Sequence, residues 1–258
     1  VPMSWPEQTV KIVETEKTTH VGSIRYRTIG GNVRQMVVLI SQLRAGETAK
    51  AMVTFDVTRS VIMAPRNTGD LLIPVEPPAA VRRYLSASPG IESRDPKIQQ
   101  LSREIGQQEL NDWQQAEAIY DWVRENIRYK FDKQLRGAQA ALKSGQGDCE
   151  ELTSLFVALC RARGLPARSV WIPGHCYPEF YLQDADGHGY WFPCQAAGTR
   201  AFGAMPEYRP VLQKGDNFRV PGISKPQRYV SDLLKARAVT AALNVKFTRQ
   251  RVEPGKNP

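Results

Sequence analysis

The sequence predicts an α+β fold in which a small β-sandwich precedes a region of helices and antiparallel strands. Three observations carry this prediction: short β-prone runs up to residue 75, helical spacing with capping residues between 95 and 164, and alternation with a period of two after 175. The chain of 258 residues is long enough for one large domain or two modest ones. We expect two domains, 1–75 and 76–258.

The first 75 residues alternate β-prone runs with turn signals. Gly30-Gly31-Asn32 and Ala45-Gly46-Glu47 are the turn signals, and this spacing is typical of a small antiparallel sandwich. The segment 64–78 contains four prolines and a Gly-Asp pair, which is typical of a linker. The predicted strands are the runs Val10–Val13, Ile24–Arg27, Met36–Ile40 and Met52–Val57.

Two helices are predicted before residue 130. Asp95-Pro96 combines an N-capping residue with proline at the first helical position, and apolar residues follow at helical spacing. Asp112 is the predicted N-cap of the second helix. Its apolar face consists of Ala116, Ile119, Tyr120, Val123 and Ile127.

A cysteine stands at the start of the third predicted helix. The run 145–152 places Cys149 directly behind a glycine-flanked turn. A helix N-terminus offers unpaired N–H groups and a partial positive charge, both of which favour the nucleophilic thiolate. The helix continues with one apolar face and ends at Gly164, with Pro166 beyond it. The alternative is a buried structural cysteine.

Residues 175–195 predict a β-hairpin, because apolar residues occupy even positions on both sides of the turn sequence 184–187. A turn centred near Ala185 pairs residues whose numbers sum to 370. His175 would then face Gln195, and Cys176 would face Cys194. The even face is expected to pack against the helices, and the odd face carries His175.

A helix-borne nucleophile needs a base, and the base needs an orienting partner. His175 is the predicted base, with a satisfied strand histidine as the alternative. In the predicted register, Gln195 is the third residue. The order of cysteine helix, histidine strand and polar residue on the adjacent strand favours catalysis over chance.

The span from about Asp112 to Gly203 resembles the transglutaminase-like core of the papain-like cysteine enzymes, and the β region is similar to the sandwich that often precedes bacterial members. The resemblance implies a papain-like core of helices plus antiparallel sheet, and a catalytic domain over 76–258. The matching pieces are 118–123, Asn126–Tyr129, Gly147-Asp148-Cys149, Leu155–Arg168, His175 with Glu179, and Trp191-Phe192-Pro193.

By this resemblance, Cys149 is the nucleophile and His175 the general base and acid. The family usually carries an aspartate where this chain has Gln195. An amide oxygen can accept the histidine N–H, but it stabilises an imidazolium less than a carboxylate does. Glu179 is the nearest alternative carboxylate, with a surface or pairing charge as its other possible role.

The oxyanion of an acyl-transfer transition state needs hydrogen-bond donors. The backbone N–H of Cys149 is the expected donor. Tyr129 is a second candidate, with a buried packing tyrosine as the alternative. Trp191 is, with Tyr129 and Glu179, a further candidate for a supporting residue of the site.

The sequence thus favours a cysteine-dependent acyl-transfer enzyme that acts as a peptidase or amidase on a protein or peptide substrate. Two alternatives remain: a protein-glutamine transglutaminase with an amine acceptor, and a catalytically weakened binding module on the same scaffold. The net charge of +9 raises a third idea, binding to the cell envelope or a polyanion. The sequence does not determine the oligomeric state.

Other composition signals narrow the partners. The basic residues are scattered and not interleaved with aromatic ones, so no nucleic-acid partner is expected. The cysteines at 149, 160, 176 and 194 lack metal-type spacing. We expect no cofactor and no metal, treat Asp184 and Asp186 as turn formers, and favour free thiols over a 176–194 disulfide unless the protein is exported. No transmembrane segment is expected, and export is favoured over a cytoplasmic location.

Overall fold

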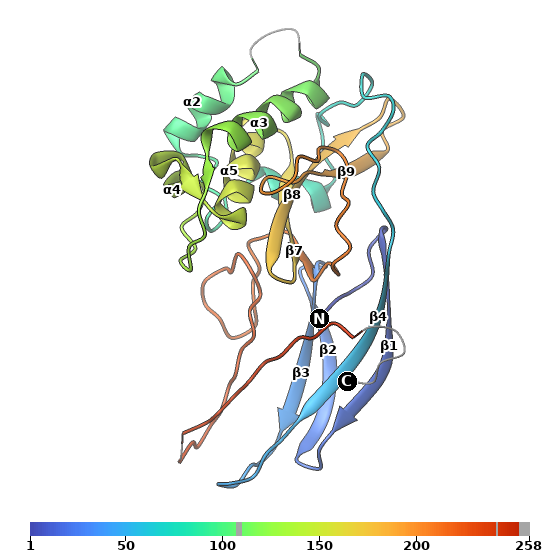
Figure 1. Cartoon of the computed structure of the whole chain (residues 1–258), viewed down its shortest axis with the longest axis vertical. Helices are drawn as coiled ribbons and strands as arrows, with labels where there is room; N and C mark the ends of the chain where they lie inside the picture. The colour runs from blue at the N-terminus through green and yellow to red at the C-terminus, as the bar shows by residue number, and fades with distance from the viewer. Residues whose placement is uncertain (107–109, 241, 253–258) are drawn as a thin grey trace.

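The computed structural model describes residues 1–106, 110–240 and 242–252, with helices at one end and long strands at the other (Figure 1). A six-stranded sheet in the order β2-β3-β10-β7-β8-β9 connects the two ends, beside a two-stranded antiparallel pair β1-β4 and a short parallel pair β5-β6. This mixed architecture of helices and antiparallel strands confirms the predicted fold class.

The strands are β1 (Gln8–Lys17), β2 (Val21–Ile29), β3 (Val33–Ile40), β4 (Ala51–Arg59), β5 (Arg128–Tyr129), β6 (Gln146–Gly147), β7 (Ala167–Ile172), β8 (His175–Gln183), β9 (Gly189–Pro193) and β10 (Gln213–Lys214). The α-helices are α1 (Ala79–Arg82), α2 (Pro96–Glu104), α3 (Asp112–Asn126), α4 (Ala138–Ser144) and α5 (Cys149–Ala162). A 3₁₀-helix, η1 (Arg83–Leu85), follows α1.

The four β-prone runs of the first 75 residues are strands, as predicted. β2 and β3 form a hairpin whose turn contains Gly30 and Gly31 at φ +57° and +78°, a conformation that suits glycine. β3 then pairs with β10, and β10 pairs with β7. The main sheet therefore continues across the predicted boundary at residue 75, and the division into two domains stays a prediction.

A buried cluster of charges joins the N-terminal segment to this sheet. The Lys214 ammonium lies 2.7 Å from the Glu7 carboxylate and 3.1 Å from the Glu179 carboxylate. Glu179 also pairs with Arg168 at 2.5 Å. Because buried charges are tolerated only when they are paired, this cluster fixes the N-terminal segment against β8 and β10.

The main core lies between the helices and the even face of the β8-β9 hairpin, as predicted. Phe180 is fully buried there and stacks on Phe202 with ring centroids 5.1 Å apart. Trp113 from α3 meets Phe180 and Phe192 edge-on. α5 crosses this core and is buried along its whole middle, so its position relative to β8 is fixed by packing.

The helix starts follow capping rules. Asp95 caps α2 through bonds from the backbone N–H groups of Lys97 and Ile98, as predicted. The predicted cap of α3 is wrong by one residue. Asn111 is the N-cap, in a capping box with Gln114, whereas the Asp112 carboxylate accepts from the Ile73 N–H at 2.6 Å.

The predicted hairpin register is wrong by two residues. Phe180 pairs with Phe192 and Glu179 with Pro193, so paired numbers sum to 372. The turn is centred on Asp186 because Asp184 and His188 close it with a backbone bond of 2.9 Å. A shift of two preserves the face of every side chain, but Cys194 now lies opposite Pro178, away from Cys176.

The C-terminal quarter adds one short strand to the sheet. The stretch 212–218 contributes β10 at the middle of the main sheet. The stretch 231–238 is irregular and exposed.

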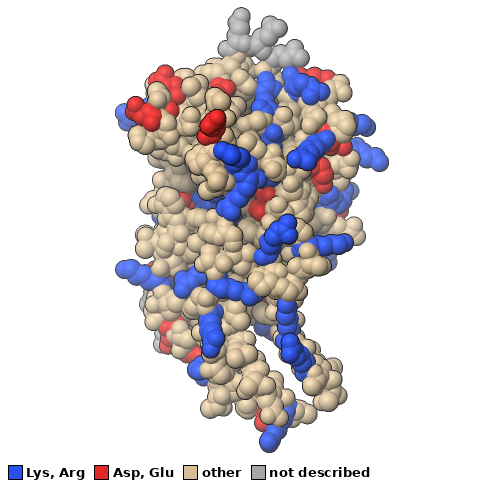
Figure 2. Space-filling model, turned by 180° about the vertical axis from the view of Figure 1, so that it is seen from behind, with Lys and Arg blue, Asp and Glu red and all other residues tan. Residues whose placement is uncertain are grey.

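The described part of the chain contains no helix that is both long and apolar enough to cross a membrane. On the face in Figure 2, Lys and Arg side chains are spread from the helical end to the strand end of the molecule. This distribution agrees with the scattered basic residues of the sequence.

Candidate active site

Cys149 is half-buried at the first position of α5, where a capping box fixes the chain. The Asp148 carboxylate accepts from the Glu150 N–H at 2.8 Å, and the Glu151 carboxylate accepts from the Asp148 N–H at 3.2 Å. Gly147 allows this packing, because a Cβ there would lie 2.4 Å from the Glu151 Cβ. The glycine-flanked start is thus a geometric requirement for the position of the cysteine.

The first residues of β8 lie against the start of α5. The Cys176 thiol points to the Cys149 carbonyl at 3.8 Å, and the Thr153 hydroxyl donates to the Cys176 carbonyl at 3.3 Å. His175 is the residue before Cys176 and is half-buried. The packing of β8 on α5 therefore brings His175 to the end of the helix that carries Cys149.

Gln195 contacts His175 directly. The Nε2 atom of His175 lies 2.9 Å from the Oε1 atom of Gln195. An amide oxygen can only accept, so Nε2 carries the proton. The other ring nitrogen, Nδ1, is then an unprotonated acceptor, which is the form a general base needs.

The environment of Cys149 opposes the expected thiolate. Burial raises the pKa of the Cys149 thiol to about 11, and the carboxylates of Asp148 and Glu150 add to this, although the backbone N–H of Cys176 partly offsets it. The expectation of a lowered pKa, drawn from the helix N-terminus, is therefore wrong. The capping carboxylate of Asp148 and the carboxylate of Glu150 thus place negative charge beside the sulfur.

Glu150 is a further titratable group at this site. Burial raises its pKa to about 7, with the neighbouring Asp148 and Glu151 charges acting in the same direction and Arg228 opposing them. The Arg228 guanidinium lies 3.8 Å from the Glu150 Oε2 atom and donates to the Glu150 carbonyl at 2.6 Å. Sequence reasoning missed this pair, since Arg228 lies 78 residues away along the chain.

Tyr129 lies beside the cysteine. β5 runs parallel to β6 and pairs Tyr129 with Gly147, two residues before Cys149. Its side chain is 56% exposed, so the alternative of a buried packing tyrosine does not hold. Partial desolvation of this side chain, together with the nearby Cys149 and Asp148 charges, raises the pKa of Tyr129. The hydroxyl thus remains a protonated donor at neutral pH.

Glu179 and Trp191 are held in a different cluster. Glu179 is 1% exposed, and although its burial alone would raise its pKa, Arg168 and Lys214 lower it. The Arg168 guanidinium also lies 3.9 Å from the centroid of the Trp191 ring. Both carboxylate oxygens of Glu179 are bound by these cations, so the structure gives Glu179 a buried ion-pairing role instead of a surface one.

The four cysteines are free, which confirms the expectation of thiols. Cys160, Cys176 and Cys194 are buried, and burial raises their pKa values well above the ordinary range. Cys149 is the one with partial exposure. Any reagent from solvent therefore reaches Cys149 first.

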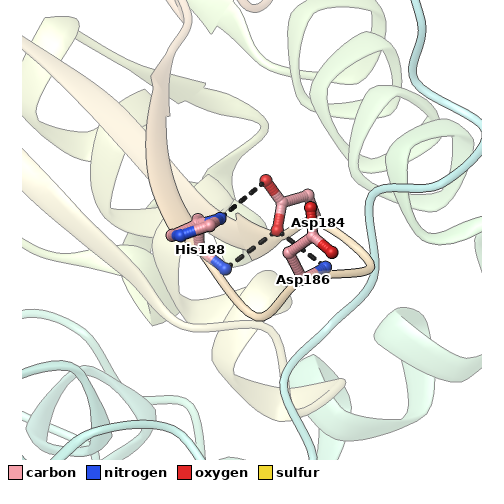
Figure 3. A group of neighbouring side chains, drawn as sticks. All are labelled: Asp184, Asp186 and His188. Carbon is pink, nitrogen blue, oxygen red and sulfur yellow. Dashed lines mark hydrogen bonds and ion pairs between the residues drawn. The ribbon is translucent and has the colours of Figure 1, made fainter.

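The turn between β8 and β9 brings Asp184, Asp186 and His188 together (Figure 3). The Asp184 Oδ1 atom accepts from the backbone N–H groups of Asp186 and His188, at 3.1 and 2.8 Å. The other oxygen accepts from the Tyr190 hydroxyl at 3.1 Å. These bonds are those of a turn-forming aspartate, the role the sequence favoured.

Part of the chain is similar in sequence to known proteins. Residues 99–196 match the family profile of the transglutaminase-like superfamily. The chain is 33% identical over 98 residues to an uncharacterized protein of Haemophilus influenzae, a match that covers 35% of this chain and 26% of that protein. This chain thus corresponds to a minor part of that relative.

Two solved structures are also similar. A candidate cysteine protease from Cytophaga hutchinsonii superposes with a TM-score of 0.60 at 20% identity, over 83% of this chain and 73% of that chain. A candidate protease from Parabacteroides distasonis gives a TM-score of 0.32 at 13% identity, over 75% of this chain and 41% of that chain.

The fold is that of the Cytophaga hutchinsonii structure, and within it the His175 and Gln195 side chains are in direct contact. Residues 99–196 are thus similar to the transglutaminase-like superfamily.

Proposed function

We propose that the protein is a cysteine-dependent acyl-transfer enzyme acting on amide bonds of a protein or peptide substrate. The observation that carries the proposal is the 2.9 Å contact between His175 Nε2 and Gln195 Oε1, which leaves Nδ1 free to accept a proton. The start of β8 packs on the start of α5, so this acceptor belongs to the same end of the helix as the Cys149 thiol.

The raised thiol pKa determines how the step would proceed. With a pKa of about 11, roughly 0.03% of Cys149 is thiolate at pH 7.5. His175 therefore acts as a general base during attack. As the sulfur bonds to the carbonyl carbon, Nδ1 takes the thiol proton and the carbonyl oxygen becomes an oxyanion.

The oxyanion would be bound by the backbone N–H of Cys149 and, as a second donor, by the Tyr129 hydroxyl. When the intermediate collapses, the C–N bond breaks and the imidazolium gives its proton to the leaving amine. The product of this half-reaction is a thioester on Cys149. Water then releases the acid with His175 again as base, which is the peptidase or amidase outcome.

The test is turnover of a peptide-amide library by the wild type and by Cys149→Ala, with Cys194→Ala as a matched thiol control. We expect the Cys149 change to abolish turnover and the Cys194 change to leave it measurable. Equal turnover by the wild type and Cys149→Ala would exclude the proposal.

The acceptor separates hydrolysis from transfer. A protein-glutamine transglutaminase would pass the acyl group to an amine, and adding a primary amine such as cadaverine would yield a stable amide. We favour water as the acceptor, so the free acid should dominate at millimolar amine. A dominant amine adduct would favour the transglutaminase alternative.

A binding module on the same scaffold is the second candidate, and the raised pKa of Cys149 together with the neutral Gln195 favours it. Iodoacetamide distinguishes the two. An enzyme with a working base should alkylate at Cys149 several times faster than its His175→Ala variant at pH 7.5. Identical rates in the two proteins would indicate an inert thiol and favour binding.

A further inference from the structure

Gln195 lies beyond the region that the β8-β9 ladder holds in place. The ladder ends at the pair Glu179 and Pro193, followed by one further bond from the Cys194 N–H to the Pro178 carbonyl at 2.9 Å. The next residue must nevertheless present its side-chain oxygen to His175. Another part of the molecule therefore has to fix the Gln195 backbone.

Helix α3 supplies this support through two side chains. The Tyr120 hydroxyl donates to the Gln195 carbonyl at 3.0 Å, and the Arg124 guanidinium donates to the same oxygen at 2.8 Å. A carbonyl oxygen has two lone pairs, so these donors saturate it. The Gln195 N–H in turn donates to the Ala201 carbonyl at 2.8 Å.

The same side chains hold the loop that follows. Arg124 also donates to the carbonyls of Ala196 and Gly198, at 3.3 and 2.9 Å. The Tyr120 hydroxyl accepts from the Ala201 N–H at 3.0 Å. Tyr120 is fully buried, and the Arg124 guanidinium lies 5.4 Å from its ring centroid. A planar guanidinium has several donors in a fixed arrangement, so it can bind a set of neighbouring carbonyls at once. A lysine ammonium would not provide this geometry.

We propose that Tyr120 and Arg124 form a clamp that positions Gln195 and, through it, sets the tautomer and orientation of His175. Both are positioning residues, since they touch neither the thiol nor the imidazole. This inference rests on the proposed role of His175 as the base.

Arg200 provides a matched control. It lies in the same loop and also reaches α3, but its guanidinium pairs with the carboxylates of Glu117 and Asp121, at 2.7 and 3.0 Å. Its side chain is half exposed. Replacing it removes a cation and a loop contact without removing a bond to Gln195.

The test is a double-mutant cycle on the rate of Cys149 alkylation by iodoacetamide at pH 7.5. Gln195→Ala should slow alkylation by about tenfold and Arg124→Gln by about three- to tenfold, because a general base contributes at least this much. In the Gln195→Ala background, Arg124→Gln should have no further effect, whereas Arg200→Gln should be near neutral throughout. An undiminished effect of Arg124→Gln in that background would overturn the clamp.

A second readout is specific to the imidazole. Nitrogen-15 NMR of His175 should report a protonated Nε2 in the wild type and in Arg200→Gln, and a mixed tautomer in Arg124→Gln. If Arg124→Gln fails to fold, Tyr120→Phe removes a single hydroxyl and should give the same change to a smaller degree. An unchanged tautomer in the folded variants refutes the proposal.

Neither readout requires a substrate. A coupled cycle without any amide turnover would leave the clamp in place and reject the proposed enzymatic function. Amide turnover together with an uncoupled cycle would reject the clamp and support the proposed enzymatic function.

Discussion

Gln195→Glu places a carboxylate where the amide oxygen now lies, 2.9 Å from His175 Nε2. A negative charge there favours the imidazolium and so raises the pKa of His175. Coulomb's law at this separation gives about 1.4 kcal/mol with water's dielectric constant and about 6 kcal/mol with an effective value of 20. Because His175 is half-buried, we take the smaller figure as the minimum, which corresponds to about one pKa unit.

An imidazolium beside the sulfur in turn favours the thiolate. The same substitution should therefore raise the alkylation rate of Cys149 at pH 7 by about tenfold, and the inflection of the rate against pH should move below 11. His175 is titrated by NMR, and alkylation is followed by mass spectrometry of the intact protein.

The matched control is Gln35→Glu on β3, which makes the same change in net charge away from the site. It should leave both measurements unchanged. A His175 pKa that stays the same or falls in Gln195→Glu, in a folded protein, would refute the geometry assigned to the histidine and Gln195.

Three further predictions concern stability. Because the pKa of Glu150 is raised from 4.5 to about 7, the folded protein loses stability as pH rises through this window. In urea titrations, Glu150→Gln should therefore raise the free energy of unfolding by about 2 kcal/mol at pH 8 and leave it unchanged at pH 4. An equal gain at both pH values would contradict this. Lys214→Met leaves the buried carboxylates of Glu7 and Glu179 without their shared cation, so by the same assay it should lower the free energy of unfolding by about 3–5 kcal/mol. A urea midpoint equal to that of the wild type would disprove this. Gly147→Ala forces a Cβ against Glu151, so it should lower the free energy of unfolding by about 1–3 kcal/mol and slow Cys149 alkylation. Gly69→Ala, at a site with ordinary contacts, should change neither the stability nor the alkylation rate.

The sequence predicted the parts of the site that depend on local signals. The glycine-flanked start of α5 and the stop at Gly164 are capping features, and the alternation of residues 180–192 reports one buried face. The contact between His175 and Gln195 survived a register error because a shift of two keeps each side chain on its face.

The parts that were missed depend on residues far apart in the chain. β10 has two residues and becomes a strand only because β3 and β7 flank it. The pKa of Cys149 could not be inferred from the helix N-terminus alone, since burial and the carboxylates of Asp148 and Glu150 raise it. The clamp from Arg124 spans 71 residues to Gln195 and has no local sequence signal.

Cys149 is proposed to form an acyl-enzyme with His175 as its base. Mass spectrometry of the protein quenched in acid during turnover of a peptide-amide library tests this most directly. We expect an acyl adduct on the Cys149 peptide in the wild type, and its absence in Cys149→Ala and in His175→Ala. Amide turnover in the wild type without any adduct at Cys149, or with the adduct retained in His175→Ala, would contradict it.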